Sequence, residues 1–189
     1  KREIASWMRT AVGIMESSHI RVARVADNMR NVAVTEGDKV EAQIKFGWEI
    51  DAYPVNEIAD YVEAVSKGDT DALVEEYYDK YEILLEGRDA GEFKKHAAVQ
   101  AQIELGFEKF LTEKDYQAIV THFGDLGSLK QLPGLAIQRL MEKGYGFGAE
   151  GDWKTAAMVR LMKIMTAGKK DAKGTSFMED YTYNFVPGK

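Results

Sequence analysis

The run Tyr116-Gln117-Ala118-Ile119-Val120-Thr121-His122-Phe123, which ends at Gly124, decides the fold class of this chain. It is short and mostly apolar, which is typical of a strand buried inside a sheet. A long helical pattern from about Phe93 precedes it, and a second helical pattern over 135–143 follows it. A buried strand between two helices favours an α/β fold with a mainly parallel sheet and helices on both faces.

Earlier in the chain, the runs 19–26 and 48–55 are predicted strands, and Pro54 limits the second. Between them, Thr35 with Asp38 three residues later resembles a capping box, which predicts a short helix that Gly47 ends. The same alternation of strand and helix therefore extends through the first third of the chain.

Further helices are predicted from their capping residues. Asn56 is expected to cap one helix, Asp69 a second, and Asp152 a third that carries Met158 and Met165 on one face. The first two are expected to lie on the sheet. The opening residues repeat apolar side chains at helical spacing, and 177–185 is strand-like, so the chain is expected to be an internal segment of something longer.

Composition limits the class of protein. The chain has 189 residues, 45% of them hydrophobic, enough for one sizeable core. Its net charge of −6 argues against a nucleic-acid or anionic-membrane surface. No apolar run approaches the ~18 residues of a membrane span. There are no cysteines, which excludes disulfides and thiolate ligands within these residues and fits a cytoplasmic location.

Two acidic residues are the candidate chemical groups. Glu150 lies among glycines just before the helix capped by Asp152, and Glu179 follows beyond that helix. Their oxygens suit Mn or Mg, although two carboxylates do not complete a metal shell. Glu150 lies inside a G-x-G-x-x-G spacing, where it would repel a pyrophosphate. By charge pattern alone, Glu150 is better interpreted as a carboxylate that favours the positive end of a helix dipole, and Glu179 as part of a solvated turn.

Histidine does not add to this pair. His19, His96 and His122 have no spacing that would place two on one helical face, and each is expected to have a structural or surface role.

Several long strings of this sequence resemble L-arabinose isomerases, in the family's order and over almost the entire chain. This resemblance outweighs the interpretation of Glu150 and Glu179 from charge pattern alone. The strings are DNMR at 27–30, AVTEGDKVEAQ at 33–43, QLPGLA at 131–136, GYGFGAEGDWKTAA at 144–157 and GTSFMEDYTY at 174–183. The resemblance implies a doubly wound, flavodoxin- or Rossmann-like central domain over 21–172. Residues 1–20 would end an N-terminal α/β domain, and 173–189 would begin a C-terminal β domain.

The resemblance also implies the site. Glu150 and Glu179 fall on the family's glutamate pair, which binds Mn(II) or another divalent cation and serves as acid and base. Met29 and Phe123 match positions that line the sugar site, the first contributed across a subunit boundary of a homo-oligomer. The family's two histidine ligands lie beyond the second glutamate, so the segment alone is expected to be inactive.

The implied reaction interconverts L-arabinose with L-ribulose, or D-galactose with D-tagatose, through a cis-enediol. A hydride shift is the mechanistic alternative, with the carboxylates acting as ligands only. A non-catalytic assembly or sugar-binding module and an L-fucose-type ketol isomerase are the alternative functions, although the latter's site strings differ from those quoted.

Overall fold

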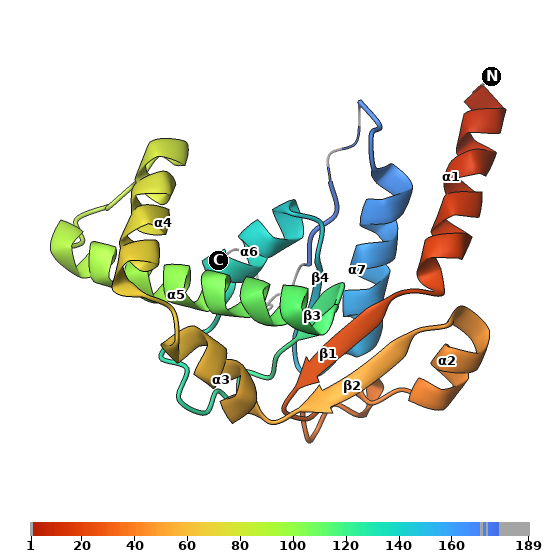
Figure 1. Ribbon diagram of the computed structural model, residues 1–189, viewed down its shortest axis with the longest axis horizontal. Helices are drawn as coiled ribbons and strands as arrows, with labels where there is room; N and C mark the ends of the chain where they lie inside the picture. Colours follow the sequence, from red (N-terminus) through yellow and green to blue (C-terminus); the bar gives the residue numbers. More distant parts are fainter. Residues whose placement is uncertain (1, 171, 173, 178–189) are drawn as a thin grey trace, which may run out of the picture.

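The computed structural model describes residues 2–170, 172 and 174–177, and it has the predicted α/β architecture (Figure 1). A four-stranded, wholly parallel sheet carries helices on both faces, so the expected doubly wound class is confirmed. Its elements, in chain order, are α1 (Arg2–Ser17), β1 (Arg21–Val25), the 3-10 helix η1 (Ala33–Thr35), α2 (Lys39–Phe46), β2 (Glu49–Tyr53), α3 (Val55–Glu63), α4 (Lys67–Lys80), α5 (Ala90–Lys114), β3 (Ala118–Val120), α6 (Gly134–Glu142), β4 (Gly146–Gly148) and α7 (Trp153–Thr166).

The strand order is β2-β1-β3-β4, and the predicted run around Val120 is the central strand β3. Strand β4, by contrast, was not predicted from the sequence. It consists of Gly146, Phe147 and Gly148, paired with Ala118, Ile119 and Val120 of β3. Glycine normally weakens a strand, so its presence in β4 needs a packing reason.

Helix α7 supplies that reason. A Cβ added to Gly146 would lie 2.1 Å from the carbonyl oxygen of Ala156, and one added to Gly148 would lie 2.4 Å from that of Asp152. On this face α7 and α2 cover a cluster formed by Ile20, Val22, Ala42, Trp48, Ala118, Val120, Trp153, Ala156 and Ala157. The glycines therefore allow the backbone of α7 to approach the sheet closely.

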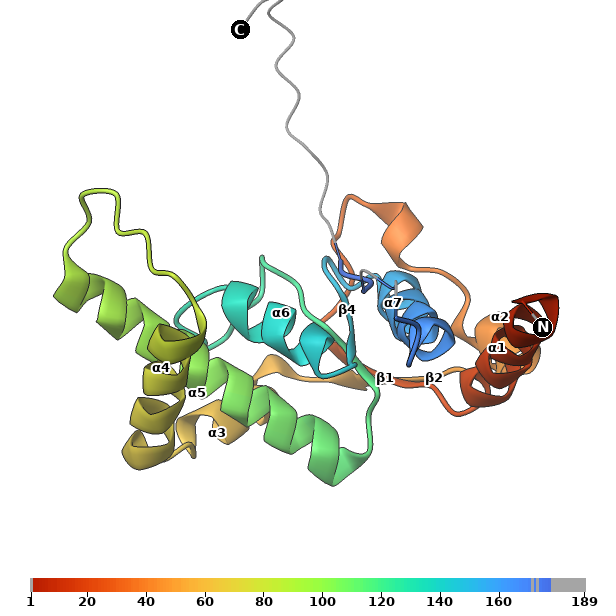
Figure 2. The same ribbon diagram turned by 90° about the horizontal axis from the view of Figure 1, so that it is seen from above.

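The other face is covered by α3, α5 and α6, which bury large side chains such as Phe107, Phe110 and Leu140 against it. Helix α4 does not lie on the sheet as expected. It packs on the outer side of α5 through a separate cluster that includes Leu73, Tyr77 and Ala101 (Figure 2). The apolar face of α4 is buried against another helix. The spacing of apolar residues predicts that a face is buried but does not show whether a helix or a sheet covers it.

Three predicted helix caps were wrong. Thr35 belongs to η1, and α2 is capped by Asp38, whose side chain accepts a hydrogen bond from the backbone N–H of Glu41. Asn56 lies inside α3, which begins after Pro54 without a side-chain cap. Helix α4 is capped by Ser66 and not by Asp69. For α2 and α4 the true cap lies three residues from the predicted one, whereas α3 has no side-chain cap.

Helix α1 forms as predicted and packs on α7 (Figure 1). Several of its apolar residues, including Ile4, Met8 and Met15, are exposed. No helix in the described ranges is both long and apolar enough to cross a membrane. The predicted strand over 177–185 lies outside the described residues apart from Phe177.

Candidate functional site

Three of the four predicted site residues follow the carboxyl ends of neighbouring strands. Met29 lies after β1, Phe123 after β3 and Glu150 after β4. Because β1, β3 and β4 are adjacent and parallel, these positions meet at one edge of the sheet. The chain leaves β1 toward β2 on one side and returns to β3 on the other, which creates a topological switch point. Ligands of open α/β sheets bind at such points.

Backbone hydrogen bonds join these segments. The N–H of Met29 donates to the carbonyl oxygen of Glu150 at 2.8 Å, and the N–H of Gly151 donates to that of Thr121 at 3.2 Å. Gly151 has φ +78°, and a Cβ there would lie 2.4 Å from Cα of Asn28. The turn that carries Glu150 is therefore clamped between the segments that follow β1 and β3.

Glu150 itself has a left-handed backbone with φ +58°. A residue other than glycine in this region costs of order 1–3 kcal/mol, a strain that concentrates at functional positions. The side chain is half-buried. A carboxylate held in this way is a suitable oxygen ligand for a divalent cation.

The described residues do not form a metal centre among themselves. Within 2–170, 172 and 174–177, no group of three His, Asp or Glu side chains gathers closely enough to hold an ion. Glu179, the predicted partner of Glu150, lies outside the described residues. The described part of the chain therefore offers one fitting ligand, Glu150, and the pair remains a prediction.

A cavity of about 310 Å³ opens between the carboxyl ends of β3 and β4 and the start of α6. Phe123 lines it, as does Ala149, the residue before Glu150, whereas Glu150 and Met29 do not. Phe177 also lines it, with its ring edge-on to Phe147 at 5.3 Å. The remaining lining residues are Thr121, Leu132, Pro133, Gly134, Ile137, Gln138 and Phe147.

Asp152 begins α7 as predicted, with its carboxylate accepting from the backbone N–H groups of Lys154 and Thr155. The Nζ of Lys154 also lies 3.0 Å from this carboxylate. The G-x-G-x-x-G spacing thus consists of a strand and a turn, not a phosphate loop. Its first two glycines make room for α7, and its third for Asn28.

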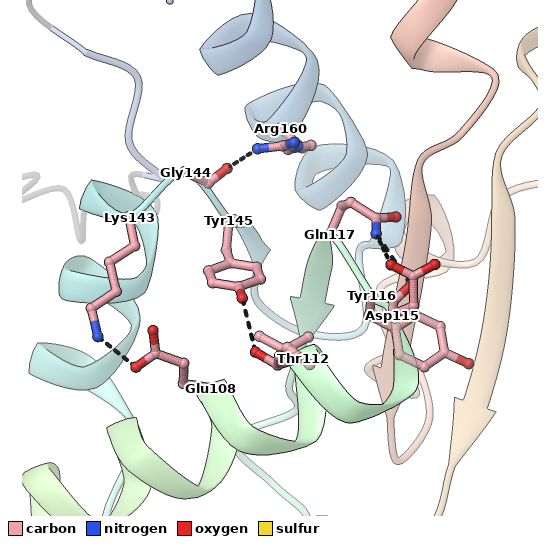
Figure 3. Close-up of a pocket in the computed structure, with 10 residues that line it drawn as sticks. Glu108, Thr112, Asp115, Tyr116, Gln117, Lys143, Gly144, Tyr145 and Arg160 are labelled. Atoms are coloured by element: carbon pink, nitrogen blue, oxygen red, sulfur yellow. Dashed lines mark hydrogen bonds and ion pairs between the residues drawn. The ribbon is translucent and has the colours of Figure 1, made fainter.

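A larger cavity of about 480 Å³ lies at the opposite, amino edge of the sheet (Figure 3). Its polar groups bind one another. The Arg160 guanidinium donates to the carbonyl oxygen of Gly144 at 2.8 Å, and Lys143 pairs with Glu108 at 2.5 Å. Burial lowers the pKa of Arg160. None of the predicted site residues lines this cavity, so its size does not identify the site.

The histidines are dispersed. His122 stacks on Phe123 with ring centres 5.6 Å apart, whereas His96 lies on α5 and His19 beside the amino edge. Sequence reasoning missed Thr121, Ala149 and Phe177 as cavity residues. The sequence offered one signal for them: Thr121 lies near the end of a predicted strand, and Ala149 and Phe177 lie in the strings that contain Glu150 and Glu179.

Comparison with known proteins identifies relatives of this chain. A family model described as the L-arabinose isomerase central domain matches residues 21–168. The chain is 54% identical over 188 residues to the L-arabinose isomerase of Geobacillus kaustophilus, 54% over 187 to that of Yersinia pseudotuberculosis serotype O:1b, and 56% over 188 to L-arabinose isomerase 1 of Bacillus licheniformis. These matches cover 99–100% of the chain and 36–37% of each relative's length.

Proposed function

The chain belongs to the L-arabinose isomerase family, and from this premise we propose that it contributes to the active site of an enzyme that interconverts L-arabinose and L-ribulose. D-Galactose and D-tagatose are the corresponding hexose pair. The observation that carries the proposal is the strained Glu150, held at the carboxyl edge of the sheet directly after Ala149, which lines a cavity together with Phe123. The chain spans about 37% of its relatives' length, so the activity belongs to the whole protein.

Glu150 and Glu179 are the proposed acid and base. One carboxylate removes the proton from C2 of the aldose, and the other carboxylic acid returns a proton to C1, while the hydroxyl proton moves between O2 and O1. Phe177, two residues before Glu179 in the sequence, lines the same cavity as Ala149, the neighbour of Glu150. This supports the proposal that both glutamates serve one site.

The same glutamates would hold the divalent cation, Mn(II) in this proposal. When bound, such a cation supplies positive charge that stabilises the developing enediolate. The left-handed turn and half-buried side chain of Glu150 support this role, because they hold its carboxylate at the carboxyl edge of the sheet.

A homo-oligomer that shares its sites completes the proposal, together with a cytoplasmic location. Met29 would reach the site of a neighbouring subunit while its backbone N–H holds the Glu150 turn of its own chain. One loop would thus couple two sites.

The decisive experiment replaces Glu150 with Gln in the complete protein. The variant keeps the shape and left-handed turn but loses the proton-transferring group, so kcat/KM should fall by about 10³ or more while thermal unfolding is unchanged. Glu108→Gln at the amino-edge cavity is the matched control and should retain wild-type activity. Wild-type activity in Glu150→Gln would end the proposal.

Solvent-isotope labelling distinguishes the two mechanisms. In D₂O, an enediol route places deuterium at C1 of the ketose, because the returned proton exchanges with solvent. A product that contains no deuterium at C1 would assign the reaction to a hydride shift, with Glu150 and Glu179 as ligands only.

A further inference from the structure

One wall of the cavity that Phe123 lines is formed by the segment 132–134 and the first turn of α6. This wall has little local support. Pro133 occupies the N-cap position of α6 and makes no side-chain capping bond, and Gly134 follows it. Its position must therefore be set from elsewhere in the structure.

Gln100, on the neighbouring helix α5, provides that support. Its Nε2 group donates to the side-chain oxygen of Gln131 and to the carbonyl oxygen of Leu132, each at 2.8 Å. Its Oε1 atom accepts from the backbone N–H groups of Leu135 at 3.1 Å and Ala136 at 3.2 Å. One amide therefore binds the wall on both sides of Pro133 and Gly134.

These bonds complete the start of α6. The first N–H groups of a helix lack partners within it. Gly134 N–H donates to the carbonyl oxygen of Leu132, and Ile137 N–H to that of Pro133. Leu135 and Ala136, which lie between them, are satisfied by Gln100. A side chain from another helix thus replaces the missing cap.

We propose that Gln100 is a positioning residue that sets the distance between this wall and Phe123, and thereby the length of sugar that the site accepts. The inference rests on the proposed function. In the proposed pose, C1 and C2 of the sugar lie at Glu150, and its other end enters the cavity that Ala149, the residue before Glu150, lines. L-Arabinose and D-galactose differ at that end by one hydroxymethyl group.

A neutral amide is required at position 100 because the two sides of the wall need opposite hydrogen-bond roles. Leu132 offers an acceptor, whereas Leu135 and Ala136 offer donors. A glutamate would still cap α6 but would repel the Leu132 carbonyl. The Nε2 atom of Gln131 lies 2.8 Å from Nδ1 of His96. The side chain that accepts from Gln100 is therefore itself held in place by a second residue of α5.

The test compares Gln100→Met with Gln102→Met in the complete protein. Gln102 lies on the same helix and lines a different cavity, near Ser128 and Leu129. For Gln100→Met we expect the ratio of kcat/KM for L-arabinose to that for D-galactose to change by at least about fivefold, mainly through KM. Gln102→Met should leave the ratio unchanged. Equal ratios in the two variants would overturn the inference.

Hydrogen exchange measures the wall independently of catalysis. In Gln100→Met the amides of Leu135 and Ala136 should exchange at least about tenfold faster than in the wild type, because their acceptor is lost. Gln100→Glu should keep their protection yet still alter the sugar ratio. If the wild type isomerises neither sugar, the proposed function fails, whereas unchanged exchange in Gln100→Met refutes the positioning role itself.

Discussion

The two faces of the sheet meet their helices through opposite kinds of side chain. On the α7 face, Gly146 and Gly148 let the helix backbone approach the strand. On the opposite face, Phe147, from the same strand, packs among the large residues under α3, α5 and α6. Successive side chains of a strand point to opposite faces, so three residues satisfy both requirements. The comparison teaches that Gly146 and Gly148 serve helix packing.

The largest effect is expected for Gly146→Ala. The added Cβ would meet the backbone oxygen of Ala156, which no side-chain rotation relieves, so the variant should lose at least about 5 kcal/mol of unfolding free energy. Gly68→Ala, at an open position in α4, should gain up to about 1 kcal/mol. Chemical denaturation measures both. Wild-type stability in Gly146→Ala would mean that α7 does not need the close approach.

The face that α3, α5 and α6 cover carries a buried ionic cluster, which lies between α4, α5 and α6. Glu104 is fully buried, and its carboxylate accepts from Arg139 at 2.7 Å and from the Tyr77 hydroxyl at 2.7 Å. Arg139→Met would leave this charge with Lys143, whose Nζ lies 3.1 Å from Glu104, and should cost about 3 kcal/mol. Glu104→Leu combined with Arg139→Met should recover most of the loss in urea unfolding. A double variant no more stable than the single one would contradict this account.

The same cluster should make stability fall at alkaline pH. Burial, followed by the hydrogen bond to Glu104, raises the pKa of Tyr77. In the unfolded chain Tyr77 ionises near pH 10, whereas in the folded protein it stays protonated. Its contribution is therefore complete below about pH 10 and is lost above it, by about 1.4 kcal/mol per pH unit.

Tyr77→Phe removes this share of the pH dependence, so its unfolding free energy should decline less steeply between about pH 10 and 11. Tyr116, whose pKa is raised by burial and by its bond to Asp51, remains in both proteins. Parallel curves for the two proteins would show that Tyr77 is not protected.

The smallest effect concerns the helix caps. Asp38→Ala removes the acceptor for the Glu41 N–H and should cost about 1 kcal/mol. Asn56→Ala should change stability by less than about 0.5 kcal/mol, because Asn56 lies inside α3 and caps nothing. Thermal unfolding of the two variants measures both losses. A larger loss for Asn56→Ala than for Asp38→Ala would support Asn56 as the cap of α3.

Much of the fold could be predicted from local pattern. The apolar run around Val120 indicated β3, and Asp152 indicated the start of α7, because both signals lie within a few neighbouring residues. Strand β4 was not predicted, because two of its three residues are glycines and the run therefore shows no alternation of apolar and polar side chains. Helix α4 was predicted to pack on the sheet but packs on α5, since an apolar stripe indicates that a face is buried and not which element covers it.

The site divides in the same way. Glu150, Met29 and Phe123 were singled out by resemblance, but their meeting at one edge depends on the order β1-β3-β4. Gln100 carried no sequence signal, because it acts on residues more than thirty positions away.

The sequence by itself determined the α/β class, most helix and strand positions, and the family, because periodicity, capping residues and long strings are local properties. Only the tertiary structure decided that Gly146 and Gly148 accommodate α7, that Met29 holds the Glu150 turn and that Gln100 caps α6. The physical reason is distance of approach. How near a helix lies to a strand depends on atoms far apart in the chain, which meet only once the sheet is assembled.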